Sequence, residues 1–338
     1  MSVALCGALV GCRTSGAGTD TDTTGAEDVT TSTQGSSGGG GSSSTTEGAD
    51  TGSETTAGPG SSSSSTGEAQ TGSSTGEPGD DGPVPELPTA DGRCPAFAAG
   101  DLEFFPAETG PRTARVFYDP DAGGGGPLVF WFHGTGGTPN SATNSLTSQD
   151  LDAIVAMGGM VVAPWNDPDT GQFPWFLVDE NREDDLHLMD EIVACAAAGP
   201  GIDARRIHAA GFSAGGMHVS QAAFRRASYL ASTATISGGL RGGDVPSDAP
   251  EQVVSSMILH GGASDDVAGF NFMEASEAFQ EAIEARGGYA LVCDHGGGHS
   301  VPSERGRAWE FMQAHPFGTD PSPLVAELPG WVPASCQP

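Results

Sequence analysis

A serine flanked by glycines is the strongest chemical signal in the sequence. Residues 211–215 read Gly-Phe-Ser-Ala-Gly, a G-x-S-x-G pattern centred on Ser213. The preceding stretch, 206–210, is typical of a buried strand, and 214–226 has a helical pattern. In a strand–turn–helix of this kind the glycines leave room for a sharp turn, and the serine hydroxyl projects above the sheet. The pattern predicts a nucleophilic serine.

A neutral serine is a weak nucleophile, so it needs a base and an acid that orients the base. His299 follows the last predicted strand, and Asp265 and Asp266 follow the predicted strand before it. An open α/β sheet has its active site at the carboxyl ends of its strands, so we expect the serine, the histidine and one carboxylate to meet there. Asp265 is the preferred acid, and Asp266 is the alternative.

An oxyanion hole is a further requirement, because N–H donors must meet the charge that develops on the substrate carbonyl oxygen. Residues 133–137, His-Gly-Thr-Gly-Gly, form a glycine-rich loop directly after a predicted strand. We expect the backbone N–H groups of Thr135 and Ala214 to be the donors. The alternative is that this loop is an ordinary tight turn.

The elements that must position these groups alternate along the chain. Short apolar runs predict strands at 128–132, 160–163, 206–210, 232–236, 257–260 and 289–294. Helical spacing of apolar residues predicts helices at 183–197, 214–226, 273–286 and 303–314. This alternation is typical of βαβ units, and it predicts a mostly parallel central sheet flanked by helices.

Together these motifs resemble the α/β-hydrolase esterases of the polyhydroxybutyrate depolymerase and feruloyl esterase type. The resemblance covers nearly all of 94–338 and rests on His-Gly at 133–134, Gly-Phe-Ser-Ala-Gly-Gly at 211–216, His-Gly at 260–261 followed by Asp265, and His-Gly-Gly-Gly-His-Ser-Val-Pro at 295–302. It implies the α/β-hydrolase fold, whose chain order is Ser, Asp, His. It also implies ester hydrolysis through an acyl-enzyme, without a metal or an organic cofactor.

Charge and composition argue against other classes. The net charge is −31, and the 13 basic residues are all arginines that nowhere cluster beyond a pair. Phosphate contacts need a basic face, so this distribution argues against nucleic-acid binding and against adsorption to anionic membranes. No pair of cysteines has C-x-x-C spacing, which leaves zinc binding or thioredoxin-like redox chemistry with little support.

The N-terminus has the features of an export signal. Residues 3–10 are an apolar run of signal-peptide size, and it ends in Leu-Val-Gly-Cys at 9–12, which resembles the bacterial lipobox. We therefore expect a lipoprotein-type signal peptide at 1–11, with Cys12 as the lipidated mature N-terminus. An ordinary cleaved signal is the alternative.

Aromatic residues divide the rest of the chain in two. Residues 12–92 are acidic, rich in Ser, Thr and Gly, and lack aromatic side chains. Too little apolar surface is present there to offset the entropy of ordering the backbone, so we expect a disordered linker that acts as a tether. Residues 93–338 hold all 15 Phe, five Trp and three Tyr, and form the predicted catalytic domain.

The cysteines agree with export. Removal of Cys6 with the signal and lipidation of Cys12 would leave Cys94, Cys195, Cys293 and Cys336, all in the predicted domain. Two disulfides are expected in an oxidising compartment, in any of three pairings, and four separate thiols are the alternative. We expect a lipoprotein of the outer membrane or cell surface, or a secreted protein, that contacts a membrane only through the lipid on Cys12.

The favoured hypothesis is a serine carboxylesterase in which Ser213 is the nucleophile, His299 the base and then the acid, and Asp265 the residue that orients His299. Its partner would be an ester, small or polymeric, such as a polyhydroxyalkanoate or a feruloylated or acetylated polysaccharide. The alternatives are a serine peptidase of the same fold and a noncatalytic surface-binding protein with a hydrolase-like body. Neither the particular ester nor the oligomeric state follows from the sequence.

Overall fold

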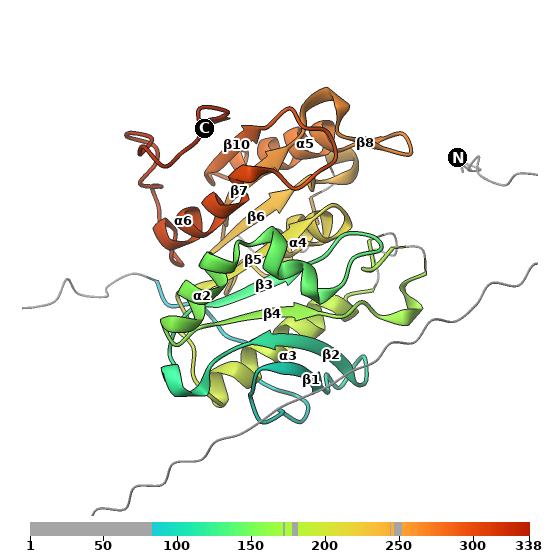
Figure 1. Cartoon of the computed structure of the whole chain (residues 1–338), viewed down its shortest axis with the longest axis vertical. Coiled ribbons are helices and arrows are strands. Elements are labelled where there is room, and N and C mark those ends of the chain that lie inside the picture. The colour runs from blue at the N-terminus through green and yellow to red at the C-terminus, as the bar shows by residue number, and fades with distance from the viewer. Residues whose placement is uncertain (1–82, 172, 178–181, 244, 247–251) are drawn as a thin grey trace, which may run out of the picture. The chain divides into compact units, whose positions relative to one another are not determined.

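The computed structural model describes residues 83–171, 173–177, 182–243, 245–246 and 252–338 (Figure 1). The predicted signal peptide, the predicted lipidation site Cys12 and residues 12–82 of the predicted linker lie outside these ranges. None of the helices within them is long and apolar enough to cross a bilayer.

Within the described residues, a nine-stranded sheet forms the centre of the domain. Its strands lie in the order β1 (Gly100–Phe104), β2 (Arg112–Phe117), β4 (Met160–Pro164), β3 (Leu128–Phe132), β5 (Ile207–Phe212), β6 (Ser232–Ile236), β7 (Ser255–His260), β10 (Ala290–Asp294) and β11 (Cys336–Gln337). Neighbouring strands from β4 to β10 run parallel, whereas β1, β2 and β11 are antiparallel additions at the two edges. The predicted, mostly parallel sheet is confirmed.

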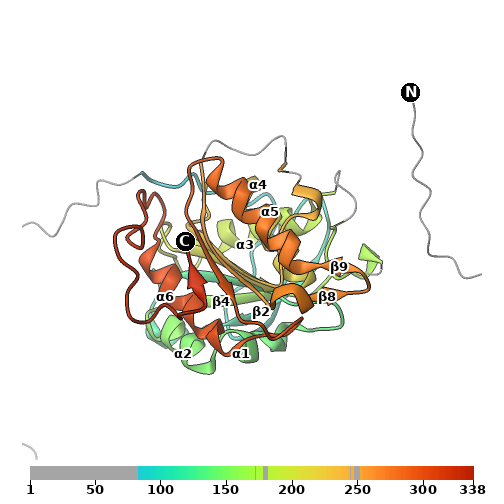
Figure 2. The same ribbon diagram turned by 90° about the horizontal axis from the view of Figure 1, so that it is seen from above.

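Helices cover both faces of this sheet (Figure 2). One face packs against α3 (Asp184–Ala198), α4 (Ala214–Arg225) and α5 (Phe272–Glu284), and the other against α1 (Ala142–Ser145), α2 (Ser148–Ala156) and α6 (Arg307–Ala314). Strand β3 shows how the two cores form, because Phe130 and Phe132 enter the first core while Val129 and Trp131 enter the second. A strand buried on both faces favours apolar residues at every position, which explains the continuous hydrophobic run of β3.

The elements that the sequence patterns did not predict include the edge strand β2, helix α2 and a small hairpin after β7. Strand β2 alternates between buried and half-buried residues and includes two arginines, so it does not form an apolar run. Helix α2 is short, and its start is defined by a capping box in which Thr147 and Asp150 exchange hydrogen bonds between side chain and backbone. A small hairpin, β8 (Asp266–Val267) and β9 (Phe270–Asn271), follows β7.

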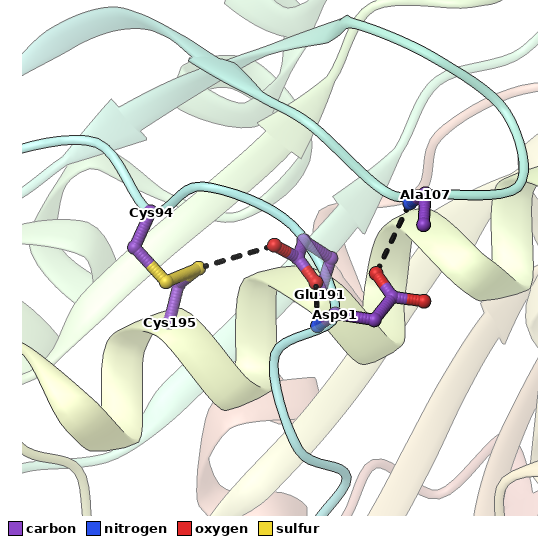
Figure 3. Close-up of a disulfide and its surroundings, with 5 residues drawn as sticks. All are labelled: Asp91, Cys94, Ala107, Glu191 and Cys195. Atoms are coloured by element: carbon purple, nitrogen blue, oxygen red, sulfur yellow. Dashed lines mark hydrogen bonds between the residues drawn. A yellow bond between two sulfur atoms is a disulfide. The ribbon is translucent and has the colours of Figure 1, made fainter.

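Two disulfides fasten the ends of the domain. Cys94, which precedes β1, is bonded to Cys195 on α3, and Cys293 on β10 is bonded to Cys336 on β11 (Figure 3 for the first). The Cys293 and Cys336 backbones are register partners in the sheet. Disulfides persist in oxidising environments, so this pairing is typical of an extracellular protein.

The end of the predicted linker lies against the domain. The Glu86 N–H donates to the Ser228 carbonyl at 3.0 Å, and Leu87 packs against the core. The Asp91 N–H donates to the Glu191 carboxylate at 3.1 Å (Figure 3). Contacts with the domain therefore begin before residue 93, the start of the predicted catalytic domain.

Glu191 shares its buried surroundings with a disulfide. Its side chain lies beside Cys94 and Cys195, and these three residues form a group of potential metal ligands in the described part of the chain (Figure 3). The two sulfurs are bonded to each other, which leaves no thiolate to bind a metal. Burial raises the pKa of Glu191. We therefore assign this cluster a structural role.

The buried histidine His208 predicts an acid-sensitive fold. Burial, with a smaller contribution from the charge on Arg206, lowers the pKa of His208 to about 3. Between about pH 6.5 and about pH 3 the unfolded chain therefore binds a proton that the folded chain does not, so stability falls as the pH drops through this window. We expect His208→Asn to reduce the slope of unfolding free energy against pH by about 1.4 kcal/mol per pH unit, measured by guanidinium denaturation between pH 7 and pH 4. An unchanged slope would contradict this account.

Candidate active site

Ser213 lies at the sharp turn between β5 and α4. Its backbone has φ 57° and ψ −122°, a conformation that a residue with a side chain rarely adopts. Strain of this kind persists only where the surrounding structure enforces it, and it is concentrated at functional sites. The turn fixes the hydroxyl at the carboxyl end of the parallel strands, where the sequence pattern had predicted it.

The two flanking glycines are required by close backbone contacts. A Cβ on Gly215 would lie 2.0 Å from the Phe132 carbonyl oxygen, and a Cβ on Gly211 would lie 2.4 Å from the Gly215 carbonyl oxygen. Neither obstacle is a flexible side chain, so neither can give way cheaply. The G-x-S-x-G spacing is therefore a packing requirement of this turn.

His299 lies between the serine and a carboxylate. Its Nε2 is 2.9 Å from the Ser213 hydroxyl oxygen, and its Nδ1 is 2.8 Å from Asp265 Oδ1. Because a carboxylate only accepts hydrogen bonds, Nδ1 carries the proton and Nε2 is left to accept from the hydroxyl. The three predicted side chains, carried by the segments that follow β5, β7 and β10, thus form one hydrogen-bonded chain.

Asp265 is the better placed of the two candidate acids. It is fully buried, and its second oxygen accepts from the Ser237 hydroxyl at 2.8 Å and from the Gly261 N–H at 2.9 Å. Burial by itself would raise the pKa of Asp265, but the hydrogen bonds from His299, Gly261 and Ser237 outweigh it and lower that pKa. Asp266 is exposed, and its carboxylate accepts from the Gly269 N–H within the β8–β9 hairpin.

This geometry predicts different effects for the two neighbouring aspartates. We expect Asp265→Ala to lower kcat for an ester by about 10⁴-fold, because His299 loses the partner that fixes its tautomer and stabilises its protonated form. Asp266→Ala, the matched control one residue along, should leave kcat within about twofold. Steady-state kinetics on a chromogenic ester gives both values, and a larger loss for Asp266→Ala would transfer the role of acid to that residue.

Three side chains that the sequence motifs did not assign contact His299 or Asp265. The His299 imidazole packs against the rings of Phe212 and Phe272, with centroid distances of 5.0 Å and 4.5 Å. Ser237 directly follows β6 and donates to Asp265. Its place at a strand end is a signal that could have suggested it, whereas Phe272 lies on a helix and had no such signal.

The candidate oxyanion loop lies directly beside the serine. A Cβ added to Gly134 would lie 2.9 Å from the Ser213 Cβ, so the two backbones are in close contact. Thr135 follows at the exposed end of the loop, and Ala214 begins α4. The first N–H groups of a helix have no acceptors within that helix. Of the two residues predicted to stabilise an oxyanion, Ala214 therefore directly follows the serine, and Thr135 follows the glycine that contacts it.

Comparison with known proteins identifies the fold. No protein-family model and no curated protein sequence matches the chain. Among solved structures, native pOPH has a TM-score of 0.59 at 20% identity, covering 72% of this chain and 96% of that chain. Native sOPH has a TM-score of 0.55 at 18% identity, covering 74% and 96%. A thermostable esterase is more distant, with a TM-score of 0.49 at 20% identity, covering 64% and 62%.

The likeness to pOPH and sOPH, the parallel sheet and the strand–turn–helix at Ser213 together define an α/β-hydrolase fold. The fold predicted from the sequence motifs is thereby confirmed.

Proposed function

We propose that the protein is a serine carboxylesterase. The observation that carries the proposal is the hydrogen-bonded chain from Ser213 through His299 to Asp265, at distances of 2.9 and 2.8 Å. A serine, a histidine and a buried carboxylate in this order can activate the hydroxyl, transfer its proton and stabilise the protonated imidazole. The α/β-hydrolase fold and the motif resemblance to depolymerase and feruloyl esterases support an ester as the substrate.

In the first half of the reaction, the Ser213 oxygen attacks the ester carbonyl while His299 Nε2 takes the hydroxyl proton. The negative charge that develops on the carbonyl oxygen is met by the N–H groups of Ala214 and Thr135. When the tetrahedral intermediate collapses, His299 gives the proton to the leaving alcohol and an acyl-Ser213 remains. Water then attacks this acyl group with His299 again acting as base, which releases the acid and restores the serine.

The lowered pKa of Asp265 supports its role in both halves of the reaction. An ionised carboxylate holds the Nδ1 proton of His299 and offsets the positive charge that the ring gains in each transition state. Because the carboxylate accepts three hydrogen bonds, its orientation is fixed before the substrate arrives. No step requires it to take up a proton.

A substrate comparison tests this function against its alternatives. The wild-type protein is assayed with p-nitrophenyl esters of increasing acyl length and with peptide p-nitroanilides of matched concentration. Preferential ester hydrolysis is expected. Preferential anilide hydrolysis would support the serine peptidase, and hydrolysis of neither would favour a noncatalytic binding protein. A panel of polyesters and feruloylated or acetylated polysaccharides then defines the natural ester class.

We propose further that the protein is exported and held at a membrane by the lipid on Cys12. A diacylglycerol group would insert into the bilayer, and the acidic chain would offer no electrostatic anchor of its own. We expect Cys12→Ser to move the protein from the membrane fraction to the soluble fraction with unchanged kcat/KM for a small ester. Retention of the Cys12→Ser protein in salt-washed membranes would contradict this proposal.

A further inference from the structure

A buried tryptophan contacts the first residue of the candidate oxyanion loop. Trp175 is 1% exposed, and its indole N–H donates to the His133 carbonyl at 2.8 Å. Its ring also packs against the rings of His133 and Phe132, each with a centroid distance of 5.0 Å. Trp175 thus makes both a polar and an apolar contact with the residue that begins the loop.

The segment that carries Trp175 is itself anchored. The next residue, Phe176, donates its N–H to Asp185 on α3 at 2.9 Å. The other oxygen of that carboxylate accepts from the buried Arg112 guanidinium at 2.7 Å. A hydrogen bond to an ionised, buried group is stronger than one between neutral groups. These bonds to Asp185 therefore fix the backbone next to Trp175.

Two successive peptides connect His133 with the Thr135 N–H, the candidate oxyanion donor. The Trp175 bond fixes the carbonyl of the first peptide, at His133. The carbonyl of the second, at Gly134, accepts from the Gly137 N–H and from His133 Nδ1, each at 2.9 Å. A trans peptide is planar, so its N–H points opposite to its carbonyl. The direction of the Gly134 carbonyl therefore sets the direction of the Thr135 N–H.

The chemistry of His133 fits this arrangement. A carbonyl cannot donate, so His133 Nδ1 must carry the ring proton, and in the described structure its Nε2 is buried without a partner. Burial lowers the pKa of His133, which keeps the ring neutral in this tautomer. The ring packs against Trp175, so the indole contacts both the carbonyl and the ring of His133.

We propose that Trp175 is a positioning residue that aims the Thr135 N–H at the oxyanion, by holding the carbonyl and the ring of His133. The inference rests on the proposed esterase function. Removing an oxyanion donor outright typically costs 10²- to 10³-fold in rate. A donor that remains but is released from its support should cost less, about tenfold, and the loss should appear only where negative charge has developed on the substrate oxygen.

The test compares two tryptophans that differ in what their indole holds. Trp175→Phe removes the bond to His133, whereas the control, Trp131→Phe, removes a bond from an equally buried indole to the Ser141 hydroxyl at 3.0 Å. A second variant at position 175 carries benzothienylalanine, which keeps both rings but has sulfur in place of the N–H, so that packing and folding are retained. Each protein is assayed with p-nitrophenyl butyrate and with an alkyl trifluoromethyl ketone, which forms a charged tetrahedral adduct with a serine.

We expect both Trp175 variants to lower kcat about tenfold and to weaken binding of the ketone by the same factor, with KM within about twofold of wild type. The Trp131→Phe protein should match wild type in all three quantities. Unchanged kcat and ketone affinity in the benzothienylalanine protein, with wild-type esterase activity intact, would overturn this inference alone. A wild-type protein that hydrolyses no ester would overturn both the inference and the proposed function.

Discussion

Replacing Ser213, the proposed nucleophile, should abolish ester hydrolysis without unfolding the protein. We expect Ser213→Ala to lower kcat for a p-nitrophenyl ester by about 10⁶-fold, because the proposed acyl-enzyme forms on the hydroxyl that this change removes. His299→Ala should cause a similar loss, and the double variant should be no worse than either single one, since the two residues act together. Steady-state kinetics with each purified variant measures these losses.

Folding is checked in the same samples. Alanine at position 213 removes only the hydroxyl, and its N–H still donates to the Ile236 carbonyl, so circular dichroism and the thermal midpoint should stay close to wild type. Gly238→Ala is a useful contrast, because a Cβ there would lie 2.7 Å from the Gly216 backbone and should disturb the fold. Substantial ester hydrolysis by a folded Ser213→Ala protein would contradict the mechanism.

The disulfide between Cys94 and Cys195 should contribute more to stability than the one between Cys293 and Cys336. It closes a loop with a sequence separation of 101 residues, for which loop-closure entropy predicts about 4.7 kcal/mol. We expect the Cys94→Ser, Cys195→Ser double variant to lose about this amount of unfolding free energy in guanidinium denaturation at pH 7. Its kcat should be unchanged, because neither cysteine is part of the candidate active site.

The second disulfide provides the matched comparison. Cys293 and Cys336 are separated by 43 residues, for which the same relation predicts about 4.0 kcal/mol. The Cys293→Ser, Cys336→Ser variant should therefore lose slightly less stability than the first. A loss below about 1 kcal/mol in the Cys94 and Cys195 variant would show that this crosslink does not restrict the unfolded chain as the loop-entropy account requires.

The parallel core and the site could be predicted because both depend on local patterns. Strands buried on two faces are rich in apolar residues, as in β3 and β4, and such runs are visible in the sequence. Ser213 and His299 each follow a strand of this kind. Since parallel strands end at one edge of the sheet, residues far apart in sequence could be placed together before the structure was known.

The rest depends on tertiary contacts that no local pattern encodes. Asp265 and Asp266 are adjacent and chemically alike, and only the start of the β8–β9 hairpin directs one toward His299 and the other to solvent. Trp175 could line a pocket or pack within a loop on sequence grounds, and its bond to His133 becomes evident only in three dimensions. The edge strand β11 has two residues and is defined by its pairing with β10.

Covalent labelling tests most directly whether Ser213 is a nucleophile activated by His299. The wild-type protein is incubated with diethyl p-nitrophenyl phosphate, whose phosphorus is attacked by an activated serine with loss of p-nitrophenolate. We predict stoichiometric release of p-nitrophenolate and a diethylphosphoryl group that peptide mass mapping places on Ser213, with no labelling of Ser213→Ala and strongly slowed labelling of His299→Ala. An unlabelled wild-type protein, or a label on another residue, would contradict the account.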